Sequence, residues 1–157
     1  CRIGKICHHL SSAISNLEIK NIFINSSVAQ HLRGDPLLSD YEEASINLKH
    51  RVKKSVVLSD AEDKARLVRI YIDFGVEWKE SQSHELLSNI DVEYVLEYSL
   101  KKDLPQECID EFALKNSTIH VWPYWREYLS SICERLNLPK LMLPTMQLTH
   151  HSRKADK

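Results

Sequence analysis

Four cysteines and eight histidines are the residues of this chain best suited to bind a metal ion or to act as nucleophiles. The histidines cluster only in Cys7-His8-His9 and in His150-His151. Adjacent side chains on a helix point about 100° apart, so two neighbouring histidines cannot both bind one ion without distortion. The cysteine spacing fits neither a disulfide framework nor a zinc finger. We therefore expect no metal site, and we interpret Cys108 and Cys133, at apolar helix positions, as small buried hydrophobic residues.

Acid–base catalysis would need paired carboxylates or a base beside a nucleophile. Glu107, Asp110 and Glu111 fall in the first turns of a predicted helix, where negative charge is favourable, and we interpret them as a solvated face. Arg126 and Glu127 are adjacent, so they do not face each other on a helix, and we expect ion pairs with other elements. With no triad, metal signature or glycine-rich phosphate loop, the sequence predicts a protein that is not an enzyme and uses no cofactor.

The composition of the whole chain indicates one domain. The 157 residues suit a single domain, and a formal net charge of -1 gives no basic footprint for nucleic acid. No apolar run approaches the about 20 residues that cross a bilayer, so we expect no membrane insertion and a cytoplasmic location. We expect a domain over residues 1–149, with an N-terminal helix within residues 1–16, and a disordered polar tail over residues 150–157.

The periodicity of apolar residues predicts the elements that must position any site. Helical spacing predicts a helix from Arg2 to Ser15. Alternation then predicts strands, of which the one over Ala65–Trp78 is the clearest, with Val68, Ile70, Ile72, Phe74, Val76 and Trp78 on one face. The other predicted strands cover Leu17–Ala29, Ala44–Leu58 and Ile90–Leu100, and a change of apolar phase near Asn21 predicts a β-bulge in the first.

One predicted strand carries a basic stripe, formed by Lys49, Arg51, Lys53 and Lys54. No aromatic residues alternate with them, which makes nucleic acid a poor partner. We interpret the stripe as the solvent face of a sheet, with contact to an acidic partner segment as the alternative.

Two helices are predicted after the strands. The first opens after Asp103 with Pro105 near its first position, and the second begins near Thr118 and is ended by Pro139. The apolar stripe of the second helix is formed by Trp122, Trp125, Leu129, Ile132, Cys133 and Leu136. The predicted fold class is α+β: a four-stranded antiparallel sheet with an N-terminal helix and two C-terminal helices packed on one face.

The most informative motif spans the second of these helices. It opens with Trp122-Pro123-Tyr124-Trp125-Arg126-Glu127 and ends with Leu138-Pro139-Lys140-Leu141-Met142-Leu143-Pro144. It resembles SecB, the bacterial protein-export chaperone, whose family has an aromatic-Pro-Tyr-Ala-Arg-Glu segment, a helix and then Phe-Pro-x-Leu-x-Leu. The positions that match are Pro123, Tyr124, Arg126, Glu127, Arg135, Pro139, Leu141 and Leu143.

The chain also departs from the export chaperones. Leu136-Asn137-Leu138 replaces their glycine-rich joint, and an N-terminal helix is present. Ser26 and Gln30 stand where those chaperones carry acidic residues that dock on the translocation motor. In these respects the chain is more similar to the SecB-like chaperones that accompany toxin–antitoxin pairs and protect an aggregation-prone antitoxin.

The resemblance implies a SecB-like fold and a homotetramer, arranged as a dimer of dimers. It implies client-binding residues Trp122, Tyr124, Trp125, Tyr128, Leu138, Leu141 and Leu143, and oligomer-interface residues Ile22, Ile24, Leu129, Ile132 and Leu136. The alternative for the aromatic residues is that the two tryptophans lie in the core and the two tyrosines at the rim of an interface.

The function implied by the resemblance is that of an ATP-independent holding chaperone for unfolded or aggregation-prone clients, either antitoxins or preproteins. The first alternative is an export chaperone that docks on the translocation motor. The second is an oligomeric adaptor domain that keeps the fold but binds no clients.

Overall fold

The computed structural model describes residues 10–37, 41–62 and 64–146. The predicted helix before residue 10, the Cys7-His8-His9 and His150-His151 clusters and the polar tail lie outside these residues. Residues 10–16 are helical and lead directly into the first strand, as predicted. None of the helices in the described ranges combines the length and apolar character needed to cross a membrane.

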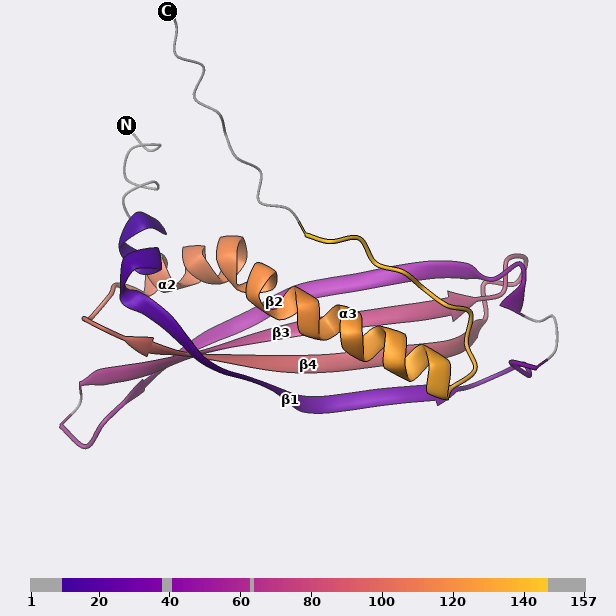
Figure 1. Cartoon of the computed structure of the whole chain (residues 1–157), viewed down its shortest axis with the longest axis horizontal. Coiled ribbons are helices and arrows are strands. Elements are labelled where there is room, and N and C mark those ends of the chain that lie inside the picture. Colours follow the sequence, from indigo (N-terminus) through magenta and orange to yellow (C-terminus); the bar gives the residue numbers. More distant parts are fainter. Residues whose placement is uncertain (1–9, 38–40, 63, 147–157) are drawn as a thin grey trace, which may run out of the picture.

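The four predicted strands form one antiparallel sheet (Figure 1). The strands are β1 (Leu17–His31), β2 (Ser45–Ser59), β3 (Ala65–Lys79) and β4 (Leu86–Leu100), in the order β1-β4-β3-β2. Strand β4 begins at Leu86 rather than at the predicted Ile90. The early part of the strand carries polar residues that are buried because they have partners, and Ser88 Oγ lies 2.5 Å from the Tyr41 hydroxyl.

Bulges interrupt both edge strands of the sheet. The register of β1 shifts between Ile19 and Asn21, which confirms the predicted bulge. A second, unpredicted shift lies between Ile24 and Ser26, and it places Val28 on the charged face, paired with Asp91, instead of on the apolar face of Ile24. Strand β2 shifts in register between Val52 and Lys54. Asn25 and Lys53 are the extra residues of these two bulges, and both reach Glu93.

The core lies between one face of the sheet and a helical layer. The alternating residues of β3 from Val68 to Trp78 are at most 2% exposed, as the period-two pattern predicted. The layer consists of α2 (Gln106–Phe112), η2 (Ala113–Ser117) and α3 (Thr118–Arg135). The two predicted helices are thus joined without a break, because η2 is a π-helical turn that continues the helix. Cys108 and Cys133 are buried free thiols, as predicted.

Helix α3 ends before the proline that was expected to end it. Its last residue is Arg135, and Asn137 adopts a left-handed backbone with φ of 52°. The amide of Leu138 donates to the Cys133 carbonyl (2.9 Å) and the amide of Asn137 donates to the Glu134 carbonyl (3.1 Å). This is the Schellman arrangement, so the helix is stopped by its own C-cap and Pro139 lies beyond it.

Candidate functional site

Helix α3 presents one row of side chains to the sheet. Val121, Trp125 and Leu129 are at most 2% exposed, and Trp125 stacks on Phe74 with ring centroids 5.2 Å apart. Trp125 was a candidate for client binding and Leu129 a candidate for an oligomer interface. The structure places both in the core of the protomer, because they lie on the row of α3 that faces β3 and β4.

A second row of α3, formed by His120, Tyr124 and Tyr128, faces β1. The Tyr128 hydroxyl lies 2.5 Å from Ser27 Oγ, and Tyr124 is 52% exposed. A shallow groove, here called the β1 groove, runs between this row and the strand, lined by Ile19, Lys20, Asn21, Ile22, His120 and Tyr124. The groove lies beside a sheet edge, and its apolar lining is partly open to solvent.

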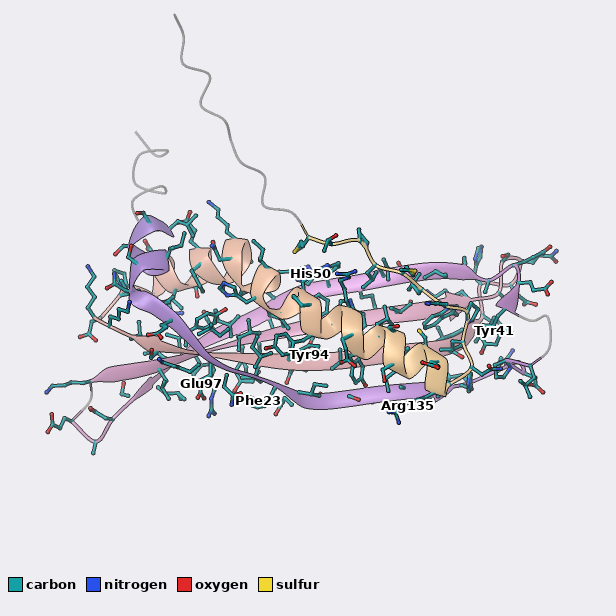
Figure 2. The ribbon with its side chains drawn as sticks, viewed as in Figure 1. Phe23, Tyr41, His50, Tyr94, Glu97 and Arg135 are labelled. Carbon is teal, nitrogen blue, oxygen red and sulfur yellow. The ribbon has the colours of Figure 1, made fainter. Side chains whose placement is uncertain are left out.

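Two tyrosines of β4, Tyr98 and Tyr94, contact the α3 residues that line the β1 groove. The Tyr98 hydroxyl and His120 Nδ1 lie 2.8 Å apart, and burial lowers the pKa of His120. Burial also raises the pKa of Tyr94, which lies beneath α3 and donates its hydroxyl to the Tyr124 carbonyl at 3.3 Å (Figure 2). The groove therefore combines the apolar side chains of Ile19 and Ile22 with the polar side chains of Lys20, Asn21 and His120.

A third row of α3 binds the segment that follows the helix. Residues 138–146, here called the C-terminal strap, run back along α3 in the opposite direction (Figure 1). Trp122 Nε1 donates to the Pro144 carbonyl at 2.9 Å, and Arg126 Nε donates to the Leu143 carbonyl at 3.1 Å. Arg126 was expected to form an ion pair. The bond that the structure shows is instead to main-chain oxygen, because the strap lies within reach of its guanidinium.

Contacts with α3 also hold the beginning of the strap. The backbone amide of Leu141 forms a hydrogen bond to the Cys133 thiol, and burial raises the pKa of this thiol to about 11. Leu138 and Leu143 are buried and Leu141 is half-buried, whereas Met142 is 77% exposed. Along Leu141-Met142-Leu143 the strap thus alternates between packed and solvent-exposed side chains, as an extended peptide does.

The face of the sheet away from α3 is charged. The basic stripe lies there, as predicted, but it is neutralised by acidic side chains of β3 and β4 that the sequence analysis did not assign. Lys49 Nζ lies 3.1 Å from Glu77, Arg51 lies 3.2 Å from Asp73, and Lys53 pairs with Glu93. Lys54 lies over the Tyr71 ring, 4.6 Å from its centroid. The alternation of side chains in β3 and β4 could have predicted that these acidic residues share one face. The basic residue with which each one pairs depends on the register of the strands.

The remaining acidic candidates are not paired carboxylates. Asp110 accepts hydrogen bonds from Ser55 and Gln106, and Glu111 pairs with Lys115 at 2.7 Å. Within the described ranges, no group of three or more histidine, cysteine or acidic residues could hold a metal ion.

The candidate interface residues separate into two groups. Ile22 and Ile24 lie on β1, on the face shared with α3, and Ile24 is 41% exposed. Ile132 and Leu136 are half-buried at the end of α3, where the Leu136 carbonyl lies 2.8 Å from His31 Nε2. Sequence reasoning missed Ile19 and the two exposed apolar residues of the other edge strand, Ile46 and Leu48.

Comparison with protein-family models finds no match, and comparison with curated proteins finds none either. Among solved structures, the chain is similar to the Rv1957 SecB-like chaperone of Mycobacterium tuberculosis, in complex with a ChAD peptide from the Rv1956 HigA1 antitoxin. The TM-score is 0.71 at 18% identity, over 90% of this chain and 98% of that one. A protein of unknown function from Streptococcus agalactiae matches with a TM-score of 0.36 at 11% identity, over 82% of this chain and 98% of that one. The first similarity shows that the fold is SecB-like.

Proposed function

We propose that this protein is an ATP-independent holding chaperone that binds extended apolar segments of aggregation-prone clients. The observation that carries the proposal is that the helical layer leaves apolar residues exposed along both edges of the sheet. Ile19, Ile24 and Tyr124 are exposed beside β1, and Ile46 and Leu48 are exposed on β2. Apolar residues concentrated along strand edges are typical of surfaces that bind other chains.

The physical basis of such binding is the burial of apolar area together with the pairing of backbone groups. Burial contributes about 25 cal/mol per Å² of apolar surface. Strand β2 is an edge strand of the described sheet, so an extended client can add a strand there while every second side chain faces the apolar side. Several weak contacts along one client act together, and this explains how binding could be firm without ATP.

The two edges are proposed to have different partners. We assign the β1 edge to self-assembly into a dimer of dimers, with Ile22 and Ile24 in the contact and Tyr124 and Tyr128 at its rim. Ile132 and Leu136 would extend this interface. The β2 edge and the face of α3 that carries Trp122 and meets Leu138, Leu141 and Leu143 are then assigned to the client.

An antitoxin is the client class that the structural similarity supports, since the similar mycobacterial chaperone was solved with an antitoxin peptide. The helical segment before β1 agrees with the resemblance of the sequence to antitoxin-protecting chaperones. Docking on a translocation motor gains no support from β1, where Ser26 and Gln30 are exposed and neutral. A cytoplasmic location is part of the proposal.

The test is light scattering of a chemically unfolded client diluted into buffer with and without this protein, in the absence of ATP. We expect suppression of aggregation at about one tetramer per client. The Leu48→Asp variant should suppress aggregation less, and Glu62→Gln, a change at an exposed turn, should act like the unmodified chain. If several clients, including an antitoxin, aggregate at the same rate with a several-fold excess of the protein, the proposal is wrong.

A further inference from the structure

We propose that the C-terminal strap occupies, within its own chain, the cleft that accepts a client, and that an extended apolar client segment takes the place of residues 139–146. This inference rests on the proposed function and identifies its binding site. The side chains that define the cleft are Trp122 and Arg126 on α3, together with Cys133.

The contacts between α3 and the strap are those of a peptide-binding site. All three hydrogen bonds join a side chain of α3 to a main-chain group of the strap: the carbonyls of Leu143 and Pro144 and the amide of Leu141. Main-chain groups are the same in every peptide, so this recognition does not depend on the strap's own sequence. Trp122 donates its hydrogen bond to a main-chain carbonyl. A proline such as Pro144, which lacks an amide hydrogen, can therefore occupy this position.

The side chains of the strap show which peptides fit. Leu143 is buried and Leu141 half-buried, two residues apart on an extended chain, while Met142 between them is 77% exposed. The cleft therefore takes an extended segment with apolar residues at alternate positions. Aggregation-prone segments have this character, since alternation of apolar residues is also what a half-buried strand requires.

The strap is attached in a way that allows it to leave. In the described part of the chain, no backbone-to-backbone hydrogen bond joins residues 139–146 to another element. The fixed point is the helix end, where the Leu138 amide is bonded to the Cys133 carbonyl at 2.9 Å. Pro139 follows at once and is exposed. The segment that departs thus begins after Leu138, and the C-cap of α3 stays intact.

The strap competes with the client because it is tethered beside the cleft. A tethered segment acts at an effective concentration in the millimolar range, which lowers the apparent affinity of any other peptide. If the cleft is open in about one molecule in ten, releasing the strap should raise the affinity for a peptide about tenfold.

The experiment uses the whole chain and a fluorescein-labelled peptide with the sequence of residues 138–146, with binding followed by fluorescence anisotropy. Leu143→Asp should expel the strap and tighten peptide binding about tenfold. Met142→Asp is the matched control, because it adds the same charge to the exposed neighbouring position, and it should change binding little. Trp122→Phe, made in the Leu143→Asp chain, removes the Nε1–H donor and should weaken the binding again.

A folded Leu143→Asp chain that binds the peptide no better than the unmodified chain would overturn the inference, because the strap would then be only part of the core. Where that variant does not fold, hydrogen exchange on the unmodified chain gives the answer. The Leu141 amide should lose protection when excess peptide is added, while β3 amides keep theirs. Unchanged or increased protection at Leu141 would also overturn it.

Failure of this inference can be told from failure of the proposed function. If the unmodified chain suppresses aggregation but the Leu141 amide keeps its protection with client bound, the chaperone function stands and the site is elsewhere. If aggregation is never suppressed but the Leu143→Asp chain binds the peptide, the cleft exists and the proposed function fails.

Discussion

The ammonium group of Lys49 lies 2.6 Å from the carboxylate of Asp91, although one residue belongs to β2 and the other to β4, with β3 between them. The lysine side chain can reach across β3 because Gly75, which lies on β3, has no side chain on this face. A Cβ at that position would lie 2.6 Å from Asp91 Oδ1 and 2.7 Å from Lys49 Cε. The glycine thus opens a passage through which charges on non-adjacent strands pair.

The coupling between Lys49 and Asp91 should depend on Gly75. In a double-mutant cycle with Lys49→Met and Asp91→Asn, we expect a coupling energy of about 0.5 kcal/mol, as for partly exposed pairs. The same cycle in a Gly75→Ala chain should give a coupling near zero, because the new methyl group lies in the path of the lysine. Urea unfolding measures the unmodified chain and the seven variants of the two cycles. A coupling that survives Gly75→Ala would show that the lysine reaches Asp91 by another route.

Acid should destabilise the sheet through Glu77. Hydrogen bonds from Lys79, Asn47 and Lys49 lower the pKa of Glu77 from its usual value to about 2. A carboxyl whose pKa is lowered on folding stabilises the protein above its unfolded pKa, and this stability is lost as the pH falls through the folded pKa. This stability is therefore lost between about pH 4.5 and pH 2. Because the lysines are partly exposed and solvent weakens their interaction with Glu77, the loss should be of the order of 1 kcal/mol.

Glu77→Gln is the variant that tests this assignment. Its free energy of unfolding should change less between pH 6 and pH 3 than that of the unmodified chain, by about 1 kcal/mol. Glu62→Gln, which removes a carboxylate that is 72% exposed beside Lys64, is the matched control. An equal effect of the two substitutions would contradict the role given to Glu77.

Trp125 and Tyr124 are neighbours in sequence that should differ sharply in their contribution to stability. Trp125→Ala leaves a cavity against Phe74, and we expect it to lower the free energy of unfolding by about 3–5 kcal/mol. Tyr124→Ala removes an exposed ring, and its effect on a single protomer should lie within about 0.5 kcal/mol. Urea unfolding followed by circular dichroism checks both. Similar losses for the two variants would mean that α3 is rotated from its position here.

Assembly and client binding should be separable on the two edges. Ile24→Asp places a charge in the proposed β1 contact, and size-exclusion chromatography with light scattering should show a smaller oligomer. Ile46→Asp, a matched change on β2 at a residue that is 45% exposed, should keep the oligomer and reduce suppression of aggregation. If Ile46→Asp dissociates the oligomer and Ile24→Asp does not, the assignment of the edges is reversed.

The sheet was predictable because alternation is a local property. The residues of β3 from Val68 to Trp78 show it without interruption, and one phase change near Asn21 disclosed the first bulge of β1. The second bulge, between Ile24 and Ser26, was missed because it restores the original phase within a few residues. Two shifts so close together leave no long alternating run on either side to compare.

The contacts of the candidate site could not be predicted from the sequence, because they join residues that are far apart in the chain. The apolar stripe of α3 was recognised, but four aromatic residues in seven positions cannot be divided between core and surface until the neighbours of the helix are known. The strap decides the environment of Trp122 and Arg126, and it lies 17 residues or more away from them in the chain. The Asn137 C-cap was missed because Pro139 offered a stronger helix-stop signal nearby.

The π-helical turn η2 has a consequence for the length of the helical layer. Ala113 and Ser117, buried at its two ends, are four residues apart, and residues three or four apart share one face of a helix. Deleting Leu114, which is 68% exposed, would leave these two residues three apart and turn η2 into an ordinary α-helical turn. The buried row from Val121 to Leu129 would stay nearly in place. We therefore expect proteins that share this fold to differ in length by one residue at η2. Sequence alignments of these proteins need a gap at η2 rather than within α3.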